Sequence, residues 1–281
     1  MDRRASLNAT NKELCASPSS KNAISLLNAV LLDLGDTLVH MSRPWDDVFN
    51  DNIESLHDYL KKLGFRLDYQ QFAETFIRIF EDAASRADLY KVEIPMADII
   101  AKTLRKSRLE VLGVDLIRNA EIEFFAPEVE AWQLYPDTLE TLTTLRDEGF
   151  KMGLVSNAKS DWAVRAILEK NDITKYFGSV VTSASLRIRK PRPEIFTRTL
   201  SELAVKSSDT VFVGDSLEAD ICGARRVGMR SIHVLRKPVE AAHQAEPEAT
   251  VGSLTEAASQ ITAWKNGSLD QPPTLPRHGP P

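Results

Sequence analysis

Five short apolar runs divide the chain, and each ends in small or polar residues. They are AVLLD, KMGLVSN, GSVVTS, TVFVGDS and SIHVL, beginning at residues 29, 151, 178, 210 and 231. Runs of this length without polar alternation are typical of parallel strands covered on both faces. Amphipathic stretches separate the later runs, as in PDTLETLTTLRDEGF, where Asp137 is a predicted helix cap and Gly149 a predicted stop. The alternation predicts an α/β fold: a doubly wound, three-layer, Rossmann-like parallel sheet.

One long segment breaks this alternation. Residues 44–132 contain no convincing strand, and their apolar positions recur at helical spacing. We expect helices over residues 45–63, 69–89, 96–112 and 115–132. A helical block inserted directly after the first strand should lie over the carboxyl edge of the sheet, where ligands bind in such folds. The pattern therefore predicts a helical cap domain, residues 44–132, with hinges near Ser42 and Tyr135.

The rest of the chain supplies the core and two tails. Residues 28–43 and 133–264 form the predicted α/β hydrolase core. Segment 1–27 is positively charged but has no apolar stretch, so a secretory signal is not expected and a disordered tail is. Segment 265–281 is rich in proline and polar residues and is also expected to be disordered.

The composition mainly excludes classes of partner and of binding site. The net charge is -5 and the pI is about 5.7, which gives no electrostatic reason to expect binding to nucleic acid or to an anionic membrane. No apolar run is long enough to span a bilayer. The two cysteines are too few for a disulfide framework or a thiolate metal cluster. This usage suits a reducing compartment, and we expect a cytoplasmic protein.

The informative polar residues follow the ends of predicted strands. Taken singly, each has an ordinary explanation, such as a helix cap or a solvated loop residue. Because the carboxyl ends of parallel strands meet at one edge of a sheet, we expect the whole set to converge on one site. In chain order the set is Asp33, Ser156, Asn157, Lys190, Asp215 and Asp220.

The chemistry of this set favours phosphoryl transfer. Facing carboxylates repel each other unless a hard cation joins them, and Mg²⁺ favours oxygen ligands. A carboxylate that attacks a phosphate dianion meets a repulsion of roughly 4 kcal/mol at about 4 Å for an effective dielectric of about 20. Mg²⁺ and the ammonium group of Lys190 would offset that repulsion, and Ser156 can donate a hydrogen bond to a phosphoryl oxygen. The set predicts a reaction through an aspartyl-phosphate.

The order of these motifs resembles the haloacid dehalogenase superfamily, whose members are mostly phosphatases. The motifs are DLGDTLV, LVSNA, KPRPEIF and GDSLEADICGARRVGM. Four motifs in the right order, with a helical insert after the first, are far more specific than any single pattern. The resemblance implies a Mg²⁺-dependent hydrolase that acts on a small phosphorylated molecule.

The resemblance also implies a role for each residue that matches a motif. Asp33 would be the nucleophile, and Thr37 would steady the turn that follows it. Ser156 and Asn157 would bind the phosphoryl group, and Lys190 would hold the nucleophile and the phosphate charge together.

The implied Mg²⁺ site shows one departure from the family pattern. Its ligands would be Asp33, the backbone carbonyl of Gly35 and Asp215, with Asp220 supporting the metal or the lysine. In family phosphatases the second residue after the nucleophile is usually another aspartate, which acts as general acid and base. Here that residue is Gly35, and Asp36 stands where glycine is usual. Loss of general acid–base help costs about 10²–10⁴ in rate, so slow or substrate-restricted turnover is expected.

Four more residues are candidates for acid–base or substrate-binding roles. Asp36 could replace the missing acid if the turn is rearranged, and His40 could act as acid and base near neutral pH. Arg43 could clamp an anionic substrate, and Arg86 is a second candidate for specificity. An ordinary surface position is the competing interpretation for both His40 and Arg43.

Two other functions stay open at this point. A dehalogenase of the superfamily uses the same nucleophile on carbon and lacks the second aspartate, as Gly35 would allow. Such enzymes need no metal, however, whereas GDSLEAD keeps an acidic pair suited to one. A binding or regulatory protein with little catalysis is the other alternative, although intact Asp33, Ser156 and Lys190 are not needed for a structural role. The patterns leave the substrate and the oligomeric state open.

Overall fold

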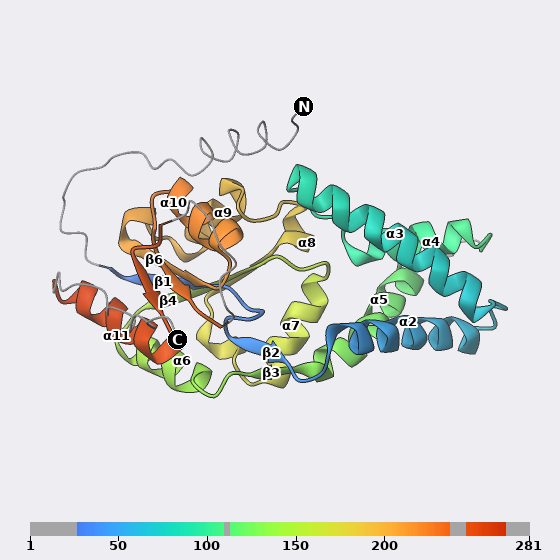
Figure 1. Cartoon of the computed structure of the whole chain (residues 1–281), viewed down its shortest axis with the longest axis horizontal. Coiled ribbons are helices and arrows are strands. Elements are labelled where there is room, and N and C mark those ends of the chain that lie inside the picture. Colours follow the sequence, from blue (N-terminus) through green and yellow to red (C-terminus); the bar gives the residue numbers. More distant parts are fainter. Residues whose placement is uncertain (1–26, 110–112, 237–245, 268–281) are drawn as a thin grey trace, which may run out of the picture.

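The computed structural model describes residues 27–109, 113–236 and 246–267. An α/β part and a group of helices make up these residues, and the helical group lies to the right of the sheet in Figure 1. Residues 1–26 and 268–281, which make up most of the two predicted tails, lie outside the described residues. None of the described helices is long and apolar enough to cross a bilayer.

A six-stranded parallel sheet forms the centre of the α/β part, in the order β5-β4-β1-β6-β7-β8. All five predicted strands are present. An additional edge strand, β8, was missed because three residues leave too short an apolar run to detect. The strands are β1 Ala29–Leu32, β4 Lys151–Ser156, β5 Ser179–Thr182, β6 Thr210–Gly214, β7 Arg230–Val234 and β8 Ala249–Val251.

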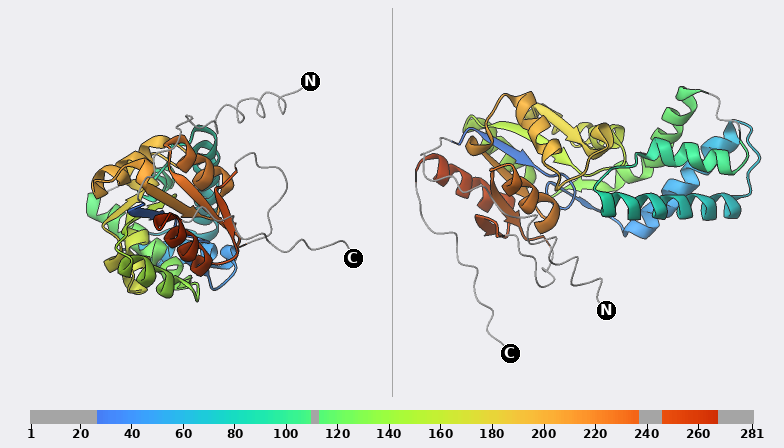
Figure 2. Two further views of the ribbon diagram at one scale, coloured as in Figure 1. Left: turned by 90° about the vertical axis from the view of Figure 1, so that its left-hand side faces the viewer. Right: turned by 90° about the horizontal axis from the view of Figure 1, so that it is seen from above.

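Helices cover both faces of this sheet, as the left view of Figure 2 shows. Leu31 packs in the apolar cluster under α9, whereas its neighbours Val30 and Leu32 belong to the larger cluster on the opposite face. The predicted three-layer α/β fold is therefore confirmed. One face carries α9 Pro193–Leu203 and α10 Gly223–Arg226, and the other carries α6 Thr138–Asp147, α7 Asp161–Lys170 and α11 Leu254–Lys265.

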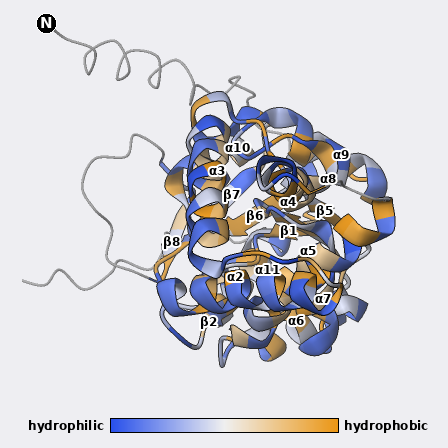
Figure 3. Cartoon of the chain, turned by 90° about the vertical axis from the view of Figure 1, so that its right-hand side faces the viewer, coloured by the Kyte–Doolittle hydropathy of each residue, from blue (hydrophilic) through white to orange (hydrophobic). Residues whose placement is uncertain are grey.

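Short helical segments complete the connections of the α/β part. They are α8 Ser183–Leu186, the 3₁₀ turns η1 Thr174–Tyr176 and η2 Ser207–Asp209, and the π-helical segment η3 Leu217–Cys222. In Figure 3 the central strands carry hydrophobic colours, whereas the outward turns of the surrounding helices are largely hydrophilic.

The helical group has the four helices that the sequence predicts. The predicted end of the third helix at residue 112 is wrong, because Ser107 ends the helix and Arg108 takes a left-handed conformation with φ 60°. The first of the four helices ends just before Gly64, which has a φ of 90°. The helices are α2 Trp45–Lys62, α3 Tyr69–Tyr90, α4 Met96–Lys106 and α5 Val114–Ala131.

A small antiparallel sheet connects the helical group to the α/β part. Its strands are β2 Val39–Met41 and β3 Trp132–Leu134. Backbone hydrogen bonds from Ser42 to Ala131 and from Tyr135 to Leu38 extend the pairing at both ends. The two chain connections therefore run side by side next to the predicted hinge positions. These strands were not predicted, since three residues carry too little pattern.

Asp137 does not cap the helix that follows it, so that part of the prediction is wrong. Its backbone is helical (φ −90°, ψ −3°), whereas a capping residue usually has an extended conformation. Its carboxylate instead accepts hydrogen bonds from Arg236 Nη2 at 2.9 Å and from the backbone N–H of Leu254 at 2.7 Å. Asp137 thus fastens the start of α11 to the start of α6. Gly149 ends α6 as predicted, with φ 80°.

Candidate active site

Three neighbouring strand ends bring the predicted site residues together. Asp33 follows β1, Ser156 is the last residue of β4, and Asp215 follows β6. Because these strands lie in the order β4-β1-β6, their carboxyl ends meet at one edge of the sheet. The backbone N–H of Asp33 donates to the carbonyl oxygen of Val213 at 3.0 Å. This bond continues the β1–β6 ladder to Asp33 and holds its backbone in place.

Lys190 lies at the centre of the buried charges. Its ammonium group donates to Asp33 Oδ1 at 2.6 Å and lies 2.7 Å from Asp220 Oδ1. A third contact, to the carbonyl oxygen of Val155 at 2.9 Å, completes the three donors of the ammonium group. All three charged side chains are buried. The cation therefore compensates two carboxylates that would otherwise repel each other away from water.

Asn157 positions the loop that carries Lys190. Its Oδ1 accepts from the backbone N–H of Lys190 at 2.8 Å, and its Nδ2 donates to the carbonyl oxygen of the same residue at 3.2 Å. Both polar ends of the amide are therefore engaged with the protein. These contacts give Asn157 a positioning role, and because it also lines the cavity, its role in binding phosphate stays a prediction. Ser156 lines the cavity described below.

Thr37 and His233 hold Asp215, the third carboxylate of the site, in place. Thr37 Oγ1 lies 3.3 Å from Asp33 Oδ2 and 3.5 Å from Asp215 Oδ1, so its single proton can serve one carboxylate at a time. His233 Nε2 donates to the backbone carbonyl of Asp215 at 2.8 Å. Asp33 and Asp215 thus face each other across one hydroxyl group.

The crowded carboxyls hold their protons more tightly than usual. Burial raises the pKa of Asp33 to about 6, although the charge of Lys190 lowers it. Burial likewise raises the pKa of Asp215 to about 7, and the charges of Asp33, Asp220 and Asp36 raise it further. Ionising such a cluster is unfavourable unless a cation is present to neutralise it.

These residues fit a magnesium ion. Oxygen atoms of Asp33, Asp215 and Asp220 all lie within 4.8 Å of one another, and oxygen donors are the ligands that Mg²⁺ prefers. Asp220 has both oxygens engaged already, one with Lys190 and the other with the backbone N–H of Ser216 at 3.0 Å. Asp33 and Asp215 are therefore the carboxylates with most capacity left for a metal.

Comparison with known proteins assigns this geometry to a family. Residues 27–228 match the family described as haloacid dehalogenase-like hydrolase. The chain belongs to this hydrolase family. It is 39% identical over 218 residues to a glyceraldehyde 3-phosphate phosphatase of Methanopyrus kandleri, covering 75% of this chain and 85% of the relative. It is 28% identical over 212 residues to a ribulose-1,5-bisphosphate 5-phosphatase of Halopiger xanaduensis, covering 74% and 84% of the two chains.

A solved structure supports the same assignment. A haloacid dehalogenase (HAD) family phosphatase from Thermococcus onnurineus matches this hydrolase with a TM-score of 0.57 and 25% sequence identity. The match covers 84% of this chain and 98% of that one, so it includes both the sheet and the helical group.

Residues 35 and 36 depart from the family pattern for two local reasons. Asp36 has a φ of 55°, a left-handed conformation that glycine takes most easily and that aspartate tolerates better than most residues. At Gly35 a Cβ atom would be in ordinary van der Waals contact with Trp132, 3.4 Å from its Cη2. The indole ring of Trp132 therefore occupies the side on which an aspartate at residue 35 would extend.

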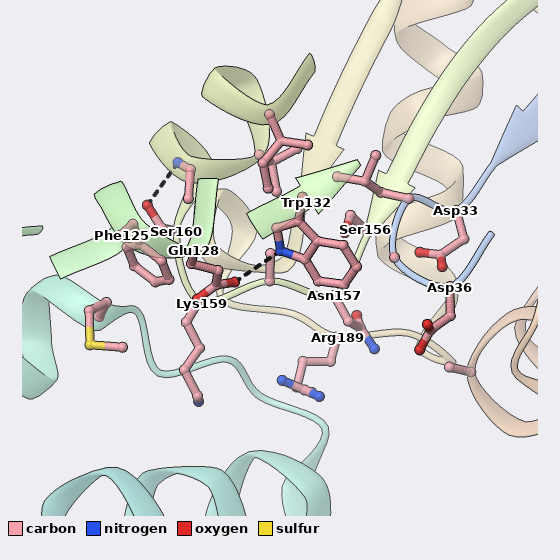
Figure 4. A pocket seen from close by; sticks show the side chains of 18 of the residues that line it. Asp33, Asp36, Phe125, Glu128, Trp132, Ser156, Asn157, Lys159, Ser160 and Arg189 are labelled. Atoms are coloured by element: carbon pink, nitrogen blue, oxygen red, sulfur yellow. Dashed lines mark hydrogen bonds between the residues drawn. The ribbon is translucent and has the colours of Figure 1, made fainter. Parts of the chain in front are cut away.

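The cavity over these residues has a volume of about 530 Å³. The α/β part contributes Asp33, Asp36 and Ser156, and the helical group contributes mainly aromatic side chains such as Phe49 and Phe124. Figure 4 shows Asp33 and Asp36 on one side of the Trp132 ring and Glu128 on the other. The cavity thus has a charged end at the sheet and a largely aromatic end at the helices.

Three sequence candidates lie elsewhere. The ring of His40 packs against Tyr135 with centroids 4.9 Å apart, and Arg43 pairs with Asp51 at 2.7 Å on the surface. Arg86 is exposed on α3. None of the three lines the cavity, whereas Asp36 does. The structure therefore does not place the proposed anion clamp, Arg43, at the site.

Lys159, Arg189, Glu128 and Trp132 are among the cavity residues that sequence reasoning missed. Lys159 and Arg189 are close neighbours of motif residues Ser156 and Lys190, and that closeness was a usable signal. Glu128 and Trp132 carried no such signal, because they reach the cavity only through the packing of the helical group. All four are labelled in Figure 4, namely Glu128, Trp132, Lys159 and Arg189.

Glu93 fastens the helical group to the site. It lies between α3 and α4 and is fully buried. Its carboxylate accepts hydrogen bonds from Arg189 Nη1 at 2.5 Å, from Ser183 Oγ at 2.7 Å and from Lys159 Nζ at 3.3 Å. Arg189 is next to Lys190 in the chain, and Lys159 is three residues after Ser156. Glu93 therefore ties the helical group to the two loops that carry these candidate site residues.

Ion pairs also account for the basic segment RIRKPR, residues 187–192. Its cationic side chains pair with neighbouring carboxylates and do not form a basic surface. The pairs are Arg187 with Asp98, Arg189 with Glu93, Lys190 with Asp33 and Asp220, and Arg192 with Glu194.

We expect Glu93→Gln to lower the free energy of unfolding by about 3–5 kcal/mol, because it leaves buried cations without their carboxylate. Urea unfolding gives the measurement. Asp98→Asn is the matched control, since Asp98 also joins the helical group to the α/β part but pairs with Arg187 on the surface. It should cost about 1 kcal/mol or less. Equal losses for the two variants would contradict the role given to Glu93.

Proposed function

We propose that the protein is a Mg²⁺-dependent phosphatase that hydrolyses small phosphate monoesters, with Asp33 as the nucleophile. The observation that carries the proposal is the position of Lys190 Nζ, 2.6 Å from Asp33 and 2.7 Å from Asp220. A cation bound to the nucleophile reduces its repulsion from a phosphate dianion. The names of the two relatives, both phosphatases of phosphorylated small molecules, support the same substrate class.

The reaction begins when a carboxylate oxygen of Asp33 attacks the phosphorus atom. The bond to the leaving alcohol breaks, and an aspartyl-phosphate forms. Ser156 donates a hydrogen bond to a phosphoryl oxygen, and Lys190 keeps a positive charge beside the nucleophile. Water then attacks the phosphorus, which releases inorganic phosphate and restores Asp33. When held by Asp33, Asp215 and the carbonyl of Gly35, Mg²⁺ supplies further positive charge for the phosphoryl oxygens.

We propose further that residues 44–132 act as a cap. Both parts of the chain line the cavity, and both chain connections between the helical group and the sheet run through the short β2–β3 pair. A cap hinged at that pair would admit the substrate and then exclude water from it. The aromatic residues of the cap would contact the leaving group rather than the phosphate.

Phosphate release from a panel of esters, measured with Mg²⁺ and in excess chelator, tests the proposed function. We expect release to require the metal, and full activity in chelator would contradict the proposed site. The dehalogenase alternative predicts the reverse pattern, with halide released from a haloacid without metal. The grouping of Asp33, Asp215 and Asp220 favours the metal-dependent reaction, because such a cluster is unfavourable unless a cation neutralises it.

Mg²⁺ binding should depend on pH in a defined direction. Because the pKa values of Asp33 and Asp215 are raised to about 6 and about 7, the folded protein holds more protons than the unfolded chain above about pH 4. Without metal, the free energy of unfolding should therefore fall as pH rises toward about 7. Mg²⁺ displaces these protons, so its affinity should rise about tenfold per pH unit for each proton released.

Thermal unfolding with and without Mg²⁺ measures this effect. The increase in Tm on adding Mg²⁺ should grow from about pH 5 to about pH 8. In Asp215→Asn one of the two titrating ligands is lost, so the increase should shrink at every pH. A constant increase in Tm across the whole range would contradict the assignment of these carboxylates as ligands.

A further inference from the structure

Glu128 is a half-buried carboxylate that accepts hydrogen bonds from two neutral side chains. Its oxygens accept hydrogen bonds from Asn52 Nδ2 at 3.2 Å and from Trp132 Nε1 at 3.3 Å. Burial raises its pKa to about 7, the two hydrogen bonds lower it, and no charged group among the described residues contributes. The side chain lines the cavity, on the side formed by the helical group.

Two buried carboxylates of the molecule have cationic partners. Asp33 contacts the ammonium group of Lys190 at 2.6 Å, and Glu93 contacts that of Lys159 at 3.3 Å. A charge taken out of water is costly unless it is paired. Glu128 therefore offers the cavity a negative charge that the described protein leaves without a counter-ion.

The surroundings of Glu128 suit a cation. Phe124 and Phe125 come from the same helix, and Phe49 and Phe80 come from α2 and α3, and all four line the cavity. The faces of aromatic rings attract cations, and cages of such rings recognise quaternary ammonium groups. The cations of the same cavity lining, Lys159 and Arg189, are already paired with Glu93.

Trp132 relates this site to the nucleophile. Its Nε1 donates to Glu128, while Cη2 at the far edge of the same ring lies 3.4 Å from where a Cβ of Gly35 would be. Gly35 is two residues from Asp33. One indole ring therefore lies between Glu128 and the nucleophile loop, as Figure 4 shows.

From these contacts we propose that Glu128 binds a positively charged group on the leaving alcohol. The substrate class is then a phosphate ester of a short amino alcohol. The phosphate would lie at Ser156 and Lys190, and the ammonium group would lie between Glu128 and the aromatic rings. This inference rests on the proposed phosphatase function and adds the chemistry of the leaving group to it.

Three esters of similar size test the inference: aminoethyl, hydroxyethyl and propyl phosphate. They differ in the terminal group, which is an ammonium, a hydroxyl or a methyl group. The parent protein with Mg²⁺ should show a kcat/KM about 10- to 100-fold higher for the aminoethyl ester than for the propyl ester, the range expected for a hydrogen bond between charged groups. The hydroxyethyl ester should fall close to the propyl ester.

Glu128→Gln should lower this ratio of aminoethyl to propyl ester to about one. The fold can accept the substitution, because Asn52 Oδ1 has no partner among the described residues and can take a hydrogen bond from the new amide after a flip. Glu130→Gln is the matched control, since Glu130 lies on the same helix with 77% of its side chain exposed. It should leave the ratio unchanged.

The outcomes separate this inference from the proposed function. Hydrolysis of all three esters at equal rates by the parent protein would overturn the inference and leave the phosphatase intact. A preference for the hydroxyethyl ester would also overturn it. Absence of phosphate release from every ester would overturn the proposed function, and the inference with it. Since the parent protein decides these cases, they do not depend on how the variant folds.

Discussion

Asp33→Asn is expected to lower kcat for every phosphate ester by about 10⁴-fold or more, the scale on which removal of a nucleophile acts. An amide nitrogen or oxygen in that place carries no negative charge and cannot form the aspartyl-phosphate. The substitution should leave the fold intact, because Lys190 keeps its contacts with Asp220 and with the carbonyl of Val155. Initial rates of phosphate release with saturating Mg²⁺ provide the measurement.

The control for this variant is Asp36→Asn, which removes a carboxylate from the same loop and the same cavity. We expect a loss well below that of Asp33→Asn, within the factor of about 10²–10⁴ that general acid–base help supplies. Comparable losses in the two variants would mean that Asp33 does not have the special role of nucleophile.

Gly35→Asp is expected to increase activity selectively. It restores a general acid at the second residue after the nucleophile, where family phosphatases usually have one. Alkyl phosphates need a proton on the departing oxygen and should gain up to the usual factor of about 10²–10⁴. Nitrophenyl phosphate has a good leaving group and should gain little. The comparison of kcat between these two ester classes, in the parent protein and in the variant, is the measurement.

Trp132 sets the condition for this gain. A Cβ at residue 35 fits at 3.4 Å from the indole ring, and the carboxyl group beyond it must find room beside that ring. Gly35→Asn is the control, because asparagine demands the same space and cannot donate a proton from an acid. A folded Gly35→Asp protein that is no faster than Gly35→Asn on every alkyl ester would contradict the assignment. Asp36 would then be the next residue to test as the acid.

The sheet was predictable because buried parallel strands leave a strong local pattern. β1, β4 and β6 are apolar on both faces, so their sequences are continuous apolar runs. Strands β2, β3 and β8 have three residues each, and such short segments form because a neighbouring strand is there to pair with. Local sequence cannot report that neighbour.

The candidate site was predictable only on the sheet side. The positions of Asp33, Ser156 and Asp215 follow from where strands end, which local sequence shows. The role of Asn157 in holding Lys190 could not be predicted in this way. A short polar side chain that binds phosphate and one that binds a loop backbone look the same in sequence.

The side of the cavity formed by the helical group could not be predicted, because it depends on tertiary packing. Glu128 lies near the end of a helix, where an acidic residue is usually exposed. It is half-buried here because α2 packs against α5 and brings Asn52 into contact with it. From the sequence, Gly35 could be interpreted only as the loss of a general acid at that position. The nearby ring of Trp132, which comes from the far end of the helical insert, adds a steric reason that sequence could not supply.

The stereochemical course of phosphate transfer tests the central claim most directly. An ester made chiral at phosphorus with oxygen isotopes is hydrolysed, and the configuration of the released phosphate is determined. Transfer first to Asp33 and then to water involves two displacements at phosphorus, so the account predicts overall retention of configuration. Inversion, the result of one direct attack by water, would contradict it.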